Sequence, residues 1–214
     1  MTLLRPRIAR ALGAVACALA CLAPASLAPA ADEDGFRPLF NGKDLSGWVT
    51  PADPALFTVE DGQIVGRTDG KLKKNEFLAT ARPYGDFTLK AKVKFKTGNS
   101  GIQVRSLRAE NGKVSGPQAD IGEGYFGSLY EEGMRSKLLV TYPKDKGKAL
   151  FKVGEWNDMV VTAQGDRITV TLNGTETVNL ADPAFLKSGI IALQVHVGPP
   201  MEVRFKDLMI KAAD

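Results

Sequence analysis

Apolar and polar residues alternate along much of the chain from residue 87 onwards, which is the pattern of β-strands with one buried face and one wet face. In the segment 87–95, FTLKAKVKF, threonine and lysine residues alternate with apolar residues. The strands that this pattern predicts most clearly are 87–95, 100–107, 137–142, 158–164, 167–173, 175–180, 189–197 and 201–212. No stretch carries apolar residues at sustained helical spacing, so the predicted fold class is all-β.

Turn residues between these segments indicate how the strands connect. Asn173-Gly174 favours a two-residue type I′ hairpin, and Gly165-Asp166 marks the turn before it, which predicts a three-stranded meander. At least ten short strands are expected, which favours two stacked antiparallel sheets, a β-sandwich, over one open sheet. Helix is expected to amount to at most one turn, at 182–186, where an aspartate followed by a proline could begin it.

The N-terminal segment 1–30 has a different pattern, which predicts a secretory signal peptide. Three arginines precede an apolar Ala/Leu run, and small residues follow at Ala28 and Ala30. Cleavage there would leave a short flexible segment, 31–35, and a single β-sandwich domain, 36–214. We therefore expect an exported protein, periplasmic or secreted, with no membrane span because the apolar run is short. Lipid attachment at Cys21 is the weaker alternative.

Removal of this segment changes what charge and cysteine content imply. The chain has 28 basic and 24 acidic residues, and three of the basic ones lie in the segment, which leaves 25 against 24. This balance gives no reason to expect a nucleic-acid partner. Both cysteines, Cys17 and Cys21, lie in the same segment, so the mature domain is expected to have neither a disulfide nor thiolate chemistry.

Three predicted strands place small and polar residues on one face and apolar residues on the other. The residues on these polar faces are Asn99, Gly101, Gln103 and Arg105; Gln118, Asp120 and Gly122; and Ala192, Gln194 and His196. A face that merely meets water usually carries lysine and threonine, as in 87–95. Amide, carboxylate and imidazole groups instead indicate the concave side of a sandwich that binds a hydroxyl-rich ligand.

His196 is the only histidine of the chain. With no second histidine and no cysteine in the mature domain, a zinc site built on such ligands is excluded, whereas carboxylate and carbonyl oxygens could hold a divalent cation of the Ca, Mg or Mn type. The position of His196 at a strand end, two residues from Gln194, favours acid/base chemistry or a ligand contact. A buried structural histidine is the alternative.

Five runs of residues resemble the 3-keto-disaccharide hydrolase family, long catalogued as a domain of unknown function. They are LFNGKDLSGW (39–48), TGNSGIQVRS (97–106), GPQADIGEGYFGSLYEE (116–132), GEWNDMVV (154–161) and GIIALQVHVGPPMEVRFKDLMI (189–210). The family is similar in fold to the concanavalin A-like lectins and glucanases, so the resemblance implies a jelly-roll sandwich. Two departures are Phe126, where tryptophan is expected, and Val197, where glycine is frequent.

The resemblance implies cleavage of a glycosidic bond in a sugar already oxidised to a ketone at C3. The ketone acidifies the C2 proton, so a base can remove that proton, the C1 substituent can leave by elimination, and water can then add. Such a site needs a base near C2, a hydrogen-bonding or positive group at the C3 oxygen, and an acid for the leaving oxygen. It does not need the paired carboxylates of ordinary glycosidases, and the Glu-x-Asp-x-x-Glu strand of laminarinase-like enzymes is absent.

The resemblance also implies residues for these roles. The groups expected at the reacting atoms are His196 or Asp120 as the base, Arg105 with Gln118 at the C3 oxygen, and Glu131 or Glu132 as the acid. One of these glutamates together with Asp120 could instead hold a divalent cation that replaces Arg105. The further residues expected to contact the sugar are Tyr125, Phe126 and Tyr130 by stacking, and Asn99, Gln103, Gln194 and Glu132 through polar groups.

A non-catalytic carbohydrate-binding domain of the same fold is the alternative function. Aromatic and neutral amide side chains suffice for binding, so the combination of Arg105, Asp120 and His196 favours an enzyme. The sequence makes no prediction about the aglycone or the oligomeric state.

Overall fold

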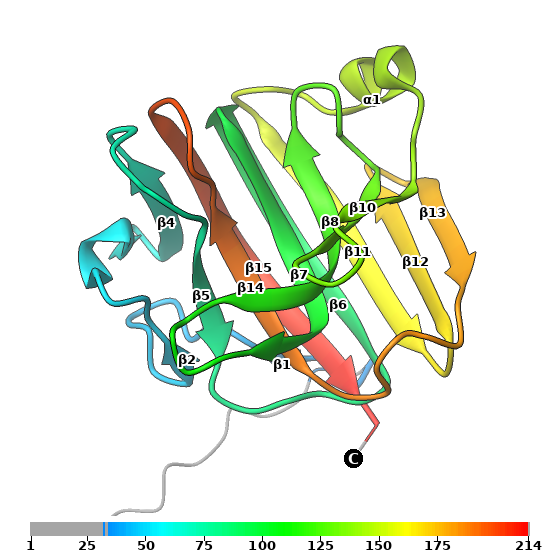
Figure 1. Ribbon diagram of the computed structural model, residues 1–214. Coiled ribbons are helices and arrows are strands. Elements are labelled where there is room, and N and C mark those ends of the chain that lie inside the picture. The colour runs from blue at the N-terminus through cyan, green and yellow to red at the C-terminus, as the bar shows by residue number, and fades with distance from the viewer. Residues whose placement is uncertain (1–31, 33, 214) are drawn as a thin grey trace, which may run out of the picture.

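The computed structural model describes residue 32 and residues 34–213 (Figure 1). The predicted signal peptide and both cysteines lie outside these residues. One sheet has eight strands: β1 (Arg37–Pro38), β3 (Phe57–Glu60), β4 (Gln63–Thr68), β6 (Phe87–Thr97), β11 (Trp156–Gln164), β12 (Arg167–Leu172), β13 (Thr175–Ala181) and β15 (Met201–Ala212). The other has seven: β2 (Trp48–Val49), β5 (Glu76–Thr80), β7 (Asn99–Arg108), β8 (Val114–Gly122), β9 (Leu129–Glu132), β10 (Lys137–Val140) and β14 (Ile190–Val195).

The two sheets are stacked, one in front of the other in Figure 1. The strand order is β13-β12-β11-β6-β15-β4-β3 in the first sheet, with β1 added on β15, and β10-β9-β8-β7-β14-β5-β2 in the second. Neighbouring strands pair antiparallel, for example β6 with β15 and β7 with β8. The predicted two-sheet antiparallel β-sandwich is therefore confirmed.

The core lies between the sheets and follows the alternation seen in the sequence. In β6, Leu89, Val93 and Phe95 are fully buried, while the lysines between them point to the other side. A second, small apolar cluster is separate from this core and consists of Phe77, Ala79, Val114 and Ala192 of the seven-stranded sheet. Because side chains alternate along a strand, this cluster lies on the outer face of that sheet.

The predicted meander is formed by β11, β12 and β13, which are consecutive neighbours in the eight-stranded sheet. At the turn between the last two, Asn173 has φ 45° and Gly174 has φ 81°. A type I′ turn needs positive φ at both central residues, so the hairpin predicted from Asn-Gly is confirmed.

The helix prediction was wrong in place and extent. The segment 182–186 is only a turn, in which Asp182 accepts a hydrogen bond from the Ala184 N–H at 2.9 Å. The helices are the 3-10 turn η1 (Pro54–Leu56) and α1 (Lys144–Leu150). The sequence of α1, KDKGKAL, has no apolar periodicity, and its glycine packs so closely that a β-carbon would lie 2.6 Å from the Phe126 carbonyl oxygen. Tertiary packing rather than local pattern favours this short helix.

Within the described part of the chain, none of the helices has the length and apolar character needed to cross a membrane.

Candidate functional site

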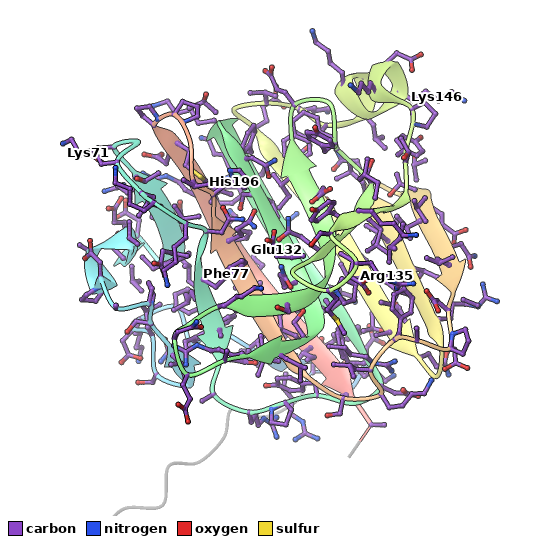
Figure 2. All side chains as sticks on the ribbon, viewed as in Figure 1. Lys71, Phe77, Glu132, Arg135, Lys146 and His196 are labelled. Carbon is purple, nitrogen blue, oxygen red and sulfur yellow. The ribbon has the colours of Figure 1, made fainter. Side chains whose placement is uncertain are left out.

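A cavity of about 480 Å³ lies on the outer face of the seven-stranded sheet, and it is lined by nine residues. They are Asn75, Asn99, Gln118, Asp120, Tyr125, Tyr130, Glu132, Leu138 and His196. Figure 2 shows two of them, Glu132 and His196, on the same face of the molecule, with Lys146 far from both on α1. Seven of the nine are residues that strand alternation or the family resemblance had predicted.

Asp120 is the most buried ionisable group of the cavity, with only 5% of its surface exposed. The pKa of its carboxyl is raised from 3.8 to about 7, mainly by burial and also by the nearby charge of Glu132, while a hydrogen bond from Gln118 opposes the shift. Across the strand pair, Asp120 is opposite Gly101, which has no side chain to cover the carboxyl. The site therefore holds a carboxyl that changes its protonation state near neutral pH.

Three buried glutamines on β8, β7 and β14, here named the glutamine row, lie beside this carboxyl on the same face of the sheet. Gln118 Nε2 donates to Asp120 Oδ1 at 2.9 Å and to Gln194 Oε1 at 3.4 Å, so both of its hydrogens are used within the protein. Gln103 Nε2 in turn donates to Gln118 Oε1 at 3.3 Å. Gln103 and Gln194 are fully buried and do not line the cavity, and they contact it only through their neighbours.

Glu132 is held at the cavity by two amide groups. Its Oε2 atom accepts from Asn75 Nδ2 at 3.3 Å and from Gln194 Nε2 at 3.4 Å. Asn75 also accepts the Val197 N–H on its Oδ1 atom at 2.9 Å, which ties Glu132 to the chain next to His196. The sequence prediction missed Asn75, which lies in a lysine-rich loop just before β5 and carries no alternation signal of its own.

His196 presents one ring nitrogen to the cavity. Its Nδ1 atom contacts the carbonyl oxygen of Val197, which can only accept a hydrogen bond. The proton of the neutral ring is therefore assigned to Nδ1, which leaves the lone pair of Nε2 for a ligand.

The remaining polar groups of the wall suit a sugar. Tyr125 is 41% exposed and offers an aromatic face. Burial raises the pKa of Tyr130, so its phenol stays neutral and able to donate. The Oδ1 atom of Asn99 is buried and has no hydrogen-bond partner among the described residues, so its capacity to accept a hydrogen bond is unused within the described part of the protein.

The structure corrects the predicted placement of Arg105. The register of β7 with β8 shifts between Gln103 and Leu107, and Arg105 itself has φ 43°. This β-bulge interrupts the alternation on which the prediction relied. Arg105 is fully buried outside the cavity, where it forms an ion pair with Asp86 at 2.5 Å.

The guanidinium of Arg105 also joins three surface loops. Its nitrogens donate to the carbonyl oxygens of Gly85 at 3.0 Å, Gly165 at 2.6 Å and Leu186 at 3.3 Å. These contacts give Arg105 a structural role at the bulge, and they leave it no contact with a ligand in the cavity.

Two further predicted residues lie outside the cavity. Glu131 is buried and paired with Arg135, whose guanidinium holds the pKa of this carboxyl below its usual value. Glu131 and Glu132 are adjacent in β9, so they point to opposite faces and only Glu132 reaches the cavity. Phe126 is 2% exposed and stacks on Phe151 at 4.2 Å, so it is a core residue rather than a sugar platform.

The described residues contain no group of three or more His, Cys, Asp or Glu side chains placed to hold a metal ion. Asp120 and Glu132 are the two carboxylates that line the cavity, and a Ca, Mg or Mn ion bound to them would need waters or carbonyl oxygens as further ligands.

The sandwich fold and a cavity lined by amides, carboxylates, tyrosines and a histidine define a carbohydrate-active β-sandwich domain. The model of the 3-keto-alpha-glucoside-1,2-lyase-like domain matches residues 35–211, and the chain belongs to this family. A sequence comparison with curated proteins gives no significant match.

Solved structures share the fold at low sequence identity. A protein of Parabacteroides distasonis, provisionally described as a glycosyl hydrolase, is 23% identical with a TM-score of 0.61, and the match covers 85% of this chain and 95% of that one. The carbohydrate-binding module CBM66 of Bacillus subtilis is 19% identical, with a TM-score of 0.58 and coverage of 78% and 96%. A Bacillus subtilis protein with a galectin-like fold is 10% identical, with a TM-score of 0.63 and coverage of 83% and 94%.

Proposed function

We propose that this protein cleaves 3-keto-glucosides by removing the C2 proton and expelling the C1 substituent. The observation that carries the proposal is Asp120, a buried carboxyl at the cavity whose pKa is raised to about 7. A general base works best when its pKa is near the working pH. The family to which the chain belongs supports the same substrate class.

In the proposed reaction Asp120 is the base. Its ionised carboxylate takes the proton from C2, the electrons of that bond form an enediolate with the C3 ketone, and the C1–O bond then breaks. The released oxygen needs a proton, and we assign this role to a proton carried on Nε2 of His196, because His196 lines the cavity while its Nδ1 atom is engaged with the Val197 carbonyl. Water then adds across the C1–C2 double bond, its hydroxyl group to C1 and one proton to C2, which gives net hydrolysis. Asp120 releases its proton to solvent and His196 takes one up, so both groups return to their starting states.

The oxygen at C3 gains negative charge and needs hydrogen-bond donors. Arg105 lies outside the cavity and the Gln118 hydrogens are both used, so neither predicted donor is kept for this role. We assign the Tyr130 phenol instead, which burial keeps neutral. Asn99 and Glu132 would orient sugar hydroxyls, and Tyr125 would stack on the ring.

The charge of the cavity supports an uncharged sugar. No lysine or arginine is among the nine described lining residues, whereas Asp120 and Glu132 are both acidic. Anionic sugars such as uronic acids would be repelled by these carboxylates. A neutral 3-keto-glucoside meets no such repulsion.

The experiment incubates the mature protein with 3-keto-trehalose or 3-keto-sucrose, and with the unoxidised disaccharides, with and without a chelator. We expect sugar release from the keto forms only, with Asp120→Asn and His196→Ala each lowering kcat by about 100-fold or more. Asp158→Asn, on the outer face of the other sheet, is the matched control and should keep full turnover. Unchanged turnover in both site variants would refute the assignment.

The second candidate function is binding without catalysis. The exposed Tyr125 and the unpartnered Asn99 oxygen, which both belong to residues that line the cavity, would serve it equally well. Saturable binding of the keto sugar by the wild-type protein with no release of product would favour this function.

A further inference from the structure

Ser106 lies at the far end of the hydrogen bonds that lead to the cavity. It is 1% exposed, and its Oγ atom lies 2.7 Å from Gln103 Oε1. The same oxygen lies 3.0 Å from the Val104 carbonyl, but a hydroxyl has one hydrogen, and the shorter contact is with the glutamine. Ser106 therefore donates to the first member of the glutamine row.

A regular strand could not place Ser106 on this face. Residues 103 and 106 are three apart, and side chains three apart in a strand point to opposite faces. The β-bulge at Arg105 reverses this relation, because the register of β7 shifts between Gln103 and Leu107. The contacts of Arg105 thus bear on the site through the position of Ser106.

Two glycines leave room for this arrangement. A β-carbon at Gly116 would lie 2.2 Å from Ser106 Oγ, and one at Gly101 would lie 2.4 Å from Gln118 Cγ. Both distances are far below normal contact, so any other residue at either position would displace the serine or the glutamine. Glycine at these two positions, Gly116 on β8 and Gly101 on β7, therefore leaves the space that the Ser106 and Gln118 side chains occupy.

The direction of the glutamine row depends on its two ends. A primary amide donates through nitrogen and accepts through oxygen, so consecutive amides in a row must all point the same way. At the cavity end, ionised Asp120 and Glu132 only accept, which requires the amide nitrogens to face them. At the other end, the Gln103 oxygen needs a donor, and Ser106 supplies it.

We propose that Ser106 is a positioning residue for the reaction of the cavity, acting through Gln103 and Gln118 to keep an amide N–H directed at Asp120. This inference rests on the proposed function for its kinetic consequence. Without the serine hydroxyl, Gln103 can turn its amide over, Gln118 follows, and an oxygen then faces Asp120. The ionised form of Asp120 then loses its hydrogen bond, so the pKa of the carboxyl rises. A smaller fraction of Asp120 is ionised and able to act as the base at neutral pH.

The experiment compares Ser106→Ala with Ser100→Ala in the mature protein. Ser100 is also buried in β7 and donates to the backbone carbonyl of Gln194 at 2.7 Å, so its removal costs one buried hydrogen bond but leaves the glutamine row intact. The first measurement is a pH titration of the Asp120 carboxyl by carbon NMR without substrate, with the signal assigned from Asp120→Asn. The second is the pH profile of kcat/KM on 3-keto-trehalose.

We expect the titration midpoint of Asp120 to rise in Ser106→Ala and to stay at the wild-type value in Ser100→Ala. At neutral pH, kcat of Ser106→Ala should fall about 2- to 10-fold with little change in KM, as expected for one lost hydrogen bond. Gln103→Met, which also removes the donor to Gln118, should shift the midpoint the same way and serves if Ser106→Ala does not fold.

Equal Asp120 midpoints in the wild type and these variants would overturn the inference. A wild-type protein that releases no product from the keto sugar would refute the proposed function instead, while the titration would still show whether Ser106 directs the glutamine row.

Discussion

The buried carboxyl of Asp120 is suited to proton transfer, but its ionisation lowers the free energy of unfolding. Its carboxyl is 5% exposed and has no cationic partner among its hydrogen bonds, only the amide of Gln118. Between the ordinary pKa of 3.8 and the folded value of about 7, the native protein binds a proton that the unfolded chain has released. The free energy of unfolding therefore falls as pH rises through this range and levels off above it.

This linkage predicts the effect of Asp120→Asn on stability. The amide cannot ionise, so the variant should be more stable than the wild type at pH 8, by at least about 1 kcal/mol, and should show no such gain near pH 4. Urea unfolding at the two pH values measures the difference. A wild type that is the more stable protein at pH 8 would contradict the raised pKa.

Arg105 is predicted to act through stability and not through ligand contact. Its removal leaves three carbonyl oxygens without donors and a buried space at the bulge, so Arg105→Ala should lower the free energy of unfolding by about 3 kcal/mol. The control is Arg108→Ala, an exposed arginine of the same strand, which should change it by no more than about 0.5 kcal/mol. Equal stability of the two variants would show that the buried contacts have no net effect.

Strand β7 shows at the element scale both the strength and the limit of alternation in sequence. Up to Gln103 the rule holds, and it identifies Asn99 as a cavity residue. Beyond that point the bulge reverses the faces, and the Arg105 side chain at the bulge is bound by loops far along the chain, such as the one that carries Gly165. A single-strand pattern contains no information about such distant partners.

Other predictions from the sequence were limited in the same way, because they depend on contacts with residues outside the local segment. Of the adjacent glutamates, the sequence could not decide which faces the cavity, because β9 is four residues long and its register depends on β8. Phe126 was predicted to stack on a sugar, but it is buried against Phe151. Phe151 follows α1 in the sequence, so the residues around Phe126 gave no sign of this contact. The Asn173-Gly174 hairpin, by contrast, is set by local backbone preference and was predicted correctly.

Strand β7 also carries a testable space requirement. In Gly101→Ala, the new methyl group would overlap Gln118 Cγ, push the amide away from Asp120 and lower kcat/KM about tenfold or more, with about 1–3 kcal/mol lost in stability. Gly85→Ala is the matched control, because the nearest atom to its β-carbon is 3.7 Å away. Equal kcat/KM for the two variants would mean that Gln118 has no part in the reaction.

For the whole molecule, the sandwich provides one apolar core and one polar face. The core between the sheets is a single large cluster, while the outer face of the seven-stranded sheet carries only the small cluster around Phe77. This division explains why fold class was predictable from alternation alone. The cavity needed more, since part of its wall comes from loops such as the one that carries Asn75.

At the same scale, we propose that the protein is exported after cleavage of residues 1–30. Expression of the full chain in a bacterium, followed by fractionation and mass measurement, should find a product that begins at Ala31 in the periplasm or the medium. Retention of the complete chain in the cytoplasm would contradict this proposal, and a lipid-modified Cys21 would identify the anchored alternative.

In the proposed function, the reaction begins with removal of the C2 proton. The most direct measurement uses 3-keto-trehalose labelled with deuterium at C2 of the oxidised ring and follows the label in the released products. We predict a slower reaction than with the unlabelled sugar and loss of deuterium from C2 to the solvent, both abolished in Asp120→Asn. Release of the keto sugar with deuterium retained at C2 would contradict the account.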